Sequence, residues 1–388
     1  MEIKVIRTDE DIINTKIKGN SVLEELKDGG EGLSFSRYFM YDPLSNTRRE
    51  IAPDIIKYDL IPVFNCIWDS PDVYFATFTD NGENQIDIAV YCYSQAEEKV
   101  KKILTFSDSV LVIDGFKMIK IFVVSEDRIL VQTEHKKDWE IQALMGNIEF
   151  VLSQYDLESG QISPVKDANL LNNGINSIIP LSKTDILVKT GYPFLEDSRI
   201  SGMSEEEALI ESIYVGSLSM FISSLQRDAS VTGAKLLDTV YFDKGILHPD
   251  VKDEYCFFSE VHYRESRKDT IFYNFVTGET LRCTNDIVEL ADISNAFIVN
   301  NIPYIRSTFE DRTEFLNIKT SEADCIFYEE TFITVVGKLF VFSSIKKGKP
   351  YVRLYRHPGL DLILEEPGVF QAGCCNDTDY YLYIKIPS

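Results

Sequence analysis

The sequence lacks the short motifs that mark common catalytic and nucleotide-binding sites. It contains no HExxH, GxSxG or GxxxxGK[ST] segment, so no metalloprotease helix, nucleophile elbow or phosphate-binding loop is predicted. It also has no run of 18 apolar residues, which argues against a membrane-spanning helix. Any chemistry must therefore come from side chains that are distant in sequence.

Basic residues are scarce, with 39 Lys and Arg against 62 Asp and Glu, and the net charge is −23. Such a field repels phosphate backbones and anionic headgroups, so we expect neither a nucleic-acid nor a membrane partner. The seven cysteines are dispersed without a CxxC pair, and the N-terminus has no apolar core of a secretory signal. We expect a cytoplasmic protein with reduced thiols. The four scattered histidines predict no metal site, and we expect no cofactor.

Two stretches of the chain repeat each other. Residues 123–133 (VVSEDRILVQT) are matched in register by residues 180–190 (PLSKTDILVKT). Each stretch predicts a strand, a polar turn and a second strand. A second pair is YDLESGQ at 155–161 and YNFVTGE at 273–279, in which a strand end is followed by a tight turn that favours glycine. Repetition at intervals of tens of residues indicates a repeat architecture.

Weaker copies of the second element bring the number of predicted hairpins to seven, the others lying at residues 41–46, 91–96, 230–233, 316–321 and 354–359. Two further β-like runs lie between successive hairpins. At the level of fold, the chain resembles a seven-bladed β-propeller with four antiparallel strands in each blade. The resemblance implies one domain over residues 1–388. Two stacked β-sandwiches are the alternative.

Closing the ring requires strands from both ends of the chain, because an open stack would leave exposed edges. Residues 369–375 and 380–386 predict two strands without a later hairpin, and the hairpin at 41–46 has no full pair before it. We therefore expect them to share one blade. Residues 1–33 are interpreted as an extension with a short helix from Ser21, and residues 191–213 as an inserted loop with another short helix.

The binding residues are expected on one face of the ring. In four-stranded blades, this face carries the connections between second and third strands and those between blades, and long loops on a rigid scaffold commonly carry function. The candidates are His135, Trp139, Tyr192, Phe194, His262 and Arg264. We predict a non-catalytic scaffold that recognises a protein or peptide partner.

An enzyme is the alternative hypothesis. The adjacent residues His262, Tyr263, Arg264 and Glu265 combine groups that can transfer a proton, hold an oxyanion and orient an imidazole, and His135 could join them. Successive strand residues point to opposite sides, so only half of them could face one site. On this hypothesis, a hydrolase, lyase or isomerase acts on a small polar substrate, such as a sugar or lactone, at the mouth of the central channel.

Overall fold

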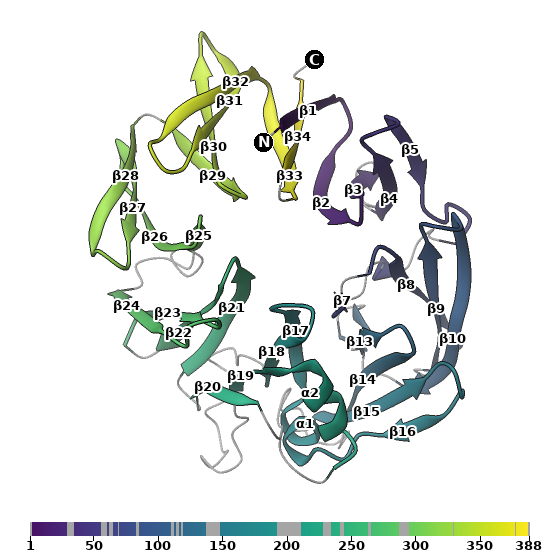
Figure 1. Ribbon diagram of the computed structural model, residues 1–388. Coiled ribbons are helices and arrows are strands. Elements are labelled where there is room, and N and C mark those ends of the chain that lie inside the picture. The colour runs from purple at the N-terminus through teal and green to yellow at the C-terminus, as the bar shows by residue number, and fades with distance from the viewer. Residues whose placement is uncertain are drawn as a thin grey trace.

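The computed structural model shows an all-β propeller in which, within the residues described, eight sheets surround a common centre (Figure 1). The structure describes residues 2–28, 35–55, 60–61, 65–68, 70–82, 85–109, 112–113, 116–117, 119–136, 148–191, 211–227, 234–240, 244–262, 265–286, 295–328, 330–376 and 378–386. In these ranges, no helix is both long and apolar enough to cross a membrane.

Seven blades contain four antiparallel strands in chain order from the ring centre outward. Blade 1 comprises β2 (Ile12–Lys18), β3 (Ser21–Asp28), β4 (Phe35–Asp42) and β5 (Thr47–Glu50). Blade 2 comprises β6 (Leu60–Ile61), β8 (Val73–Asp80), β9 (Gln85–Ser94) and β10 (Lys99–Ser109). Blade 3 comprises β13 (Ile119–Ser125), β14 (Arg128–Lys136), β15 (Ile148–Asp156) and β16 (Ile162–Pro164), with β7 (Asn65–Cys66) added parallel to β13.

The remaining four-stranded blades follow the same order. Blade 4 comprises β17 (Ile175–Pro180), β18 (Asp185–Thr190), β19 (Glu211–Ser217) and β20 (Lys235–Val240). Blade 5 comprises β21 (Lys244–Lys252), β22 (Tyr255–His262), β23 (Arg267–Asn274) and β24 (Thr280–Asp286). Blade 6 comprises β25 (Ala296–Val299), β26 (Ile302–Thr308), β27 (Arg312–Asn317) and β28 (Glu322–Tyr328). Blade 7 comprises β29 (Thr331–Val336), β30 (Leu339–Lys346), β31 (Lys349–Arg356) and β32 (Asp361–Pro367).

Blade 8 has three strands and contains both ends of the described chain (Figure 1). It consists of β33 (Val369–Cys375), β34 (Asp379–Lys385) and β1 (Glu2–Thr8). β1 runs parallel to β34, with Glu2 opposite Asp379 and Thr8 opposite Lys385. Outside the blades, the described ranges also contain a short hairpin of β11 (Val112–Ile113) and β12 (Phe116–Lys117) and the helices α1 (Ala168–Asn173) and α2 (Leu218–Ser224).

The predicted number of seven blades was wrong because it rested on counting one kind of hairpin. That hairpin joins the third and fourth strands of a blade, and blade 8 has no fourth strand among the described residues. The prediction that the hairpin at 41–46 has no full pair of strands before it was also wrong. It joins β4 to β5 in a complete blade, whose first two strands come from the segment interpreted as an extension.

The helix predicted from Ser21 was also wrong, since this segment forms β3. Its apolar residues looked helical because both faces of a propeller strand are covered by neighbouring blades. Val22 and Leu26 pack in a cluster with blade 8, whereas Leu23 packs with residues of blade 2. The helix predicted within 191–213 falls on residues outside the described ranges, except that Glu211 begins β19.

The repeated hairpins form the turns that their sequences predict. Asp156 Oδ1 accepts a hydrogen bond from the backbone N–H of Ser159 at 2.8 Å, and Asn274 Oδ1 accepts one from Thr277 at 2.8 Å. Gly160 and Gly278 follow with φ of 68° and 77°, a region that is costly for residues with a Cβ atom. An Asp or Asn three residues before a Ser or Thr thus closes the outer edge of a blade.

The longer repeat explains how blades 3, 4 and 5 are joined. Gln132 and Lys189 occupy equivalent positions in residues 123–133 and 180–190. Gln132 accepts a hydrogen bond from the N–H of Ile175 at 2.6 Å and donates to its carbonyl at 3.2 Å. Lys189 donates to the carbonyl of Ile246 at 2.5 Å. In both cases, the second strand of one blade holds the backbone of the first strand of the next.

Two rims of the ring are distinguished by their connections. The turn rim carries the connections between first and second strands, such as residues 181–184 and 253–254. The loop-rich rim carries the connections between second and third strands and those between blades.

Apolar contacts fill the interfaces between blades. The aromatic contact of Phe327 with Phe342, at 4.1 Å between ring centroids, is an example between blades 6 and 7.

Candidate functional site

Three buried ionisable side chains lie together in blade 5: Glu260, His262 and Asp269, which we call the acid–base cluster. Glu260 and His262 are two residues apart on β22 and share one face, and Asp269 on β23 is directly opposite Glu260. His262 Nε2 lies 3.2 Å from Glu260 Oε1 and 3.5 Å from Asp269 Oδ2. All three side chains are at least 93% removed from solvent.

Cationic side chains surround the acid–base cluster. Lys244 Nζ lies 3.0 Å from Glu260 Oε1, and Arg282 Nη1 lies 2.7 Å from Asp269 Oδ2 and 3.4 Å from Glu260 Oε2. The Arg267 guanidinium lies 3.1 Å from Nδ1 of His262. These contacts outweigh the effect of burial and lower the pKa of both carboxyl groups.

The geometry of the acid–base cluster superficially resembles a metal site, because one ligand atom from each residue lies within 4.8 Å of the others. However, the same carboxylate oxygens already face the ammonium of Lys244 and the guanidinium of Arg282. A dication at this position would be repelled by both groups. The described contacts therefore fit an ion-pair network better than a metal centre.

Asp238 on β20 extends the network towards blade 4. Burial is the main cause that raises the pKa of Asp238, and the negative charge of Glu260 adds to it. Lys244 and Arg282 stabilise the ionised form of Glu260. Of the two carboxyl groups, Asp238 therefore retains its proton to a higher pH than Glu260 does.

The structure places the sequence-predicted candidates in separate blades. His262 belongs to the acid–base cluster, and Glu265 is exposed, 4.0 Å from His262 Nδ1 and 2.9 Å from Arg267. His135 lies in blade 3, where its Nε2 is 2.9 Å from Thr133 Oγ1 and 3.6 Å from Asp108. Blade 4 separates the two histidines. The remaining candidates lie outside the described residues: Trp139, Tyr192, Phe194, Tyr263 and Arg264.

Sequence reasoning missed Glu260 and Asp269, the partners of His262. A signal was present, because Glu260 precedes His262 by two residues and therefore shares its face if the segment is a strand. Asp269 could be added only after the turn at residues 263–266 was located, since that turn sets which residues are opposite.

A cavity of about 440 Å³ lies at the inner ends of blades 5, 6 and 7, and we call it the ring-centre cavity. Its walls come from the first strands β21, β25 and β29 and from the start of β22. The lining residues are His248, Pro249, Asp250, Lys252, Phe257, Phe258, Ser259, Ala296, Phe297, Ile298, Thr334 and Val335. The cavity thus has apolar walls and a polar side contributed by β21.

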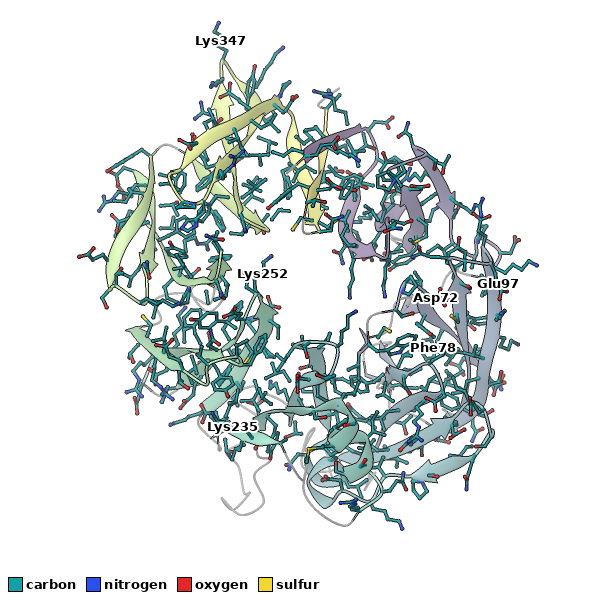
Figure 2. The ribbon with its side chains drawn as sticks, viewed as in Figure 1. Asp72, Phe78, Glu97, Lys235, Lys252 and Lys347 are labelled. Atoms are coloured by element: carbon teal, nitrogen blue, oxygen red, sulfur yellow. The ribbon has the colours of Figure 1, made fainter. Side chains whose placement is uncertain are left out.

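The polar side of the ring-centre cavity is shaped by a β-bulge between Leu247 and Asp250. His248 within this bulge has φ of 52° and is exposed. Asp250 is also open to the cavity, but the surrounding protein removes part of its hydration and raises its pKa. Figure 2 shows Lys252 pointing towards the ring centre, at the end of β21 that leads into the turn rim.

Comparisons with known proteins support the fold and no specific family. No family model matches the chain, and no curated protein matches it. Among solved structures, the chain resembles dipeptidyl peptidase 4 of Porphyromonas gingivalis, with a TM-score of 0.52, 12% identity and coverage of 91% of this chain and 52% of that one.

Two other solved structures align with lower TM-scores. Acylaminoacyl peptidase of Pyrococcus horikoshii has a TM-score of 0.46 and 13% identity, covering 92% of this chain and 52% of that chain. The β-propeller domain of the trilobed protease from Pyrococcus furiosus has a TM-score of 0.43 and 12% identity, covering 91% and 98%. The chain therefore spans about half the length of the two whole peptidases.

Proposed function

We propose that this chain is a non-catalytic propeller that binds a peptide, or an extended segment of a protein partner, in the ring-centre cavity. The observation that carries the proposal is the cavity itself, which three blades build with apolar walls and one polar side. Its volume of about 440 Å³ falls within the range of small-ligand sites, which are mostly apolar with a few placed polar groups.

The chemistry of the lining suggests how a peptide would be held. Phe257, Phe297 and Val335 would receive one large apolar side chain of the ligand. Asp250 and Lys252 would bind polar groups of its backbone or ends. Because these residues approach the turn rim, this site lies on the rim opposite the one expected from sequence. The loop-rich rim remains a second contact surface in this proposal, with His135 exposed in part.

Two further observations favour binding of a peptide without catalysis. The first is that His262 lies in the acid–base cluster, where Lys244 and Arg282 form ion pairs with the two carboxylates. Such ion pairs are typical of a network that stabilises the fold. The peptide class is favoured because a dipeptidyl peptidase shares the fold. A cytoplasmic location is part of the proposal, since Cys66, Cys92, Cys256 and Cys374 are free thiols.

The proposal is tested by filling the ring-centre cavity. Peptides are selected from a displayed random library on the unmodified protein, and the affinity of a selected peptide is measured by calorimetry. Thr334→Phe places a ring among the lining residues and is expected to weaken binding at least about tenfold, a loss of about 1.4 kcal/mol. Ile333→Phe, at an exposed position of the same strand, is the matched control and should retain affinity.

Three results would contradict this proposal. The first is a library that yields no selected peptide, and the second is equal binding by Thr334→Phe and the unmodified protein. The third is hydrolysis of the bound peptide at a rate that depends on His262 or His135, which would favour the enzyme hypothesis.

A further inference from the structure

The described lining of the ring-centre cavity contains one carboxylate, that of Asp250. The β-bulge in β21 sets its direction. Ile246 and Val251 both pack in the cluster between blades 4 and 5, although an odd number of positions separates them and a regular strand would place them on opposite faces. The bulge adds one residue to β21, and Asp250 therefore lies opposite Phe257, on the face towards the cavity.

The Asp250 carboxylate has no ion-pair partner in the described part of the chain. Its Oδ1 accepts a hydrogen bond from the backbone N–H of Val251 at 2.8 Å, and its side chain stays open to the cavity. The surrounding protein removes part of its hydration, which raises the pKa of Asp250 despite the opposing effects of the Val251 N–H and Lys252. The positive charge around this carboxylate is thus too small to compensate for the water it has lost.

The other ionisable side chains of the described lining are those of His248 and Lys252, on the same strand as Asp250. Figure 2 shows Lys252 pointing towards the ring centre. The lining residues contributed by the strands packed against β21 are uncharged: Phe257, Phe258, Ser259, Ala296, Phe297, Ile298, Thr334 and Val335. Lys252 is therefore the charged group of this lining that competes with a ligand cation for Asp250.

Two further features favour a cation over an anion at this site. The rings of Phe257 and Phe297 line the cavity, and the faces of aromatic rings attract cations. The chain has a net charge of −23, a field that draws cations towards the protein and repels anions. The sign of the whole-molecule field and the sign of the Asp250 carboxylate thus agree.

We propose that Asp250 makes the ring-centre cavity selective for ligands that carry an ammonium group next to a large apolar group. A peptide offers an ammonium group at its free N-terminus or on a lysine side chain. The inference rests on the proposed function, because it concerns the same cavity, and it adds the charge of the group that is bound. Lys252 repels this group and limits its affinity.

The test uses defined probes, so it does not depend on a selected peptide. Phe-Ala-amide carries an α-ammonium group beside a ring, and acetyl-Phe-Ala-amide is its neutral counterpart. Acetyl-Phe-Lys-amide and acetyl-Phe-Met-amide form the corresponding pair for a side-chain ammonium group. Dissociation constants are measured at about pH 7, where both amino groups are mainly protonated, by calorimetry and ligand-observed NMR on the full chain.

We expect at least one cationic probe to bind the unmodified protein at least about tenfold more tightly than its neutral counterpart. The pair with the larger ratio identifies the N-terminus or the lysine side chain as the preferred source of the ammonium group.

Variants assign this selectivity to Asp250. Asp250→Asn should weaken the binding of the cationic probe at least about tenfold and leave the neutral probe unchanged. Asp253→Asn is the matched control, because it removes the same charge from an exposed turn residue outside the described lining and keeps an oxygen to accept the N–H of Asn301. It should preserve the ratio of the two affinities. Circular dichroism and thermal unfolding verify that each variant is folded.

Lys252→Met gives a prediction of opposite sign. Removing a like charge from the cavity should strengthen the binding of the cationic probe at least about twofold. The probes are amides and offer no carboxylate to Lys252, so this variant loses no ion pair with them. A merely structural role of Lys252 would not produce tighter binding.

Three outcomes would overturn the inference: no saturable binding of either cationic probe, equal affinity for the members of both pairs, or full affinity of Asp250→Asn for the cationic probe. The proposed function is judged separately, by the peptides selected from the library and by Thr334→Phe. A selected peptide that depends on Thr334 but binds Asp250→Asn with full affinity would support the proposed function and contradict the present inference.

Discussion

At the scale of residues, the role of an ionisable side chain depends on its partners. His262 has the chemistry of a proton-transfer group. In the structure it lies between Glu260 and Asp269, and both carboxylates contact cations. Glu260 precedes His262 by two residues and lies on the same face of β22, because a strand places every second residue on one face. Strand alternation thus directs His262 towards Glu260.

Asp238 gives a prediction for the pH dependence of stability. Burial and Glu260 raise its pKa in the folded state, so the folded protein binds this proton more tightly than the unfolded chain does. The stabilisation from Asp238 is therefore complete below the ordinary carboxyl pKa of about 3.9 and is lost as pH rises through the raised pKa. Asp238→Asn replaces the protonated carboxyl group with an amide, which also donates a hydrogen bond but does not ionise. This variant should therefore not lose stability at this position as the pH rises.

The measurement is urea unfolding of Asp238→Asn and the unmodified protein at several pH values between about 4 and 8. The free energy of unfolding of Asp238→Asn, relative to the unmodified protein, should increase across this range. Asp361→Asn, at an exposed position of β32, is the control variant. A difference that stays constant or decreases with pH would show that Asp238 does not retain its proton in the folded state.

At the scale of elements, equivalent residues of a repeat have equivalent tasks. Gln132 and Lys189 each connect the second strand of their blade to the first strand of the next. Lys189 needs a counter-charge for this task because its side chain is 3% exposed, and Glu211 provides it at 3.2 Å. The neutral amide of Gln132 needs none. The same position of the repeat thus holds a neutral amide in one copy and a charged ammonium in the other. Both make a hydrogen bond to the backbone of the next blade.

Lys189→Met is predicted to destabilise the protein by about 3–5 kcal/mol, because it leaves the carboxylate of Glu211 buried without its cation. Urea unfolding measures the loss. Adding Glu211→Gln removes the buried charge and should recover part of it. A cost below about 1 kcal/mol for Lys189→Met would mean that the pair contributes little to the contact between blades 4 and 5.

At the scale of the whole molecule, β34 connects the last part of the ring to the first. Its buried residues face both neighbours: Leu382 and Ile384 pack in a cluster with blade 7, and Tyr381 and Tyr383 pack in a cluster with blade 1. The Tyr383 hydroxyl also donates to Glu24 Oε1 on β3 at 2.6 Å. β34 therefore stabilises two interfaces in addition to its own sheet.

Ending the chain after Asn376 removes β34 and is predicted to prevent stable folding, since it would leave apolar faces of blades 1 and 7 and a strand edge uncovered. Solubility after expression, circular dichroism and cooperative thermal unfolding are the measurements. Ending the chain after Ile386, which keeps all of β34, is the control and should fold. A soluble, cooperatively unfolding product that ends at Asn376 would contradict the importance of β34 for the ring.

The sequence by itself determined the propeller class and the outer hairpins, because both depend on local patterns: alternation of apolar residues, and a turn residue at a set distance from glycine. Residues 155–161 and 273–279 show this locality, as their turns form in the predicted way. The number of blades, in contrast, is not determined by any local sequence pattern. It depends on whether residues 12–28 pair with 35–50 or remain an extension, and the burial of both strand faces hides that choice in the sequence.

The ring-centre cavity was decided by tertiary structure alone. It combines residues of three blades that are far apart in the chain, such as Asp250 and Val335. No local sequence pattern predicts that these residues lie close together. Their proximity follows from the number of blades in the ring and from the twist of each blade relative to the next. Closure of the ring is a global outcome of packing, and the positions of side chains at its centre follow from it.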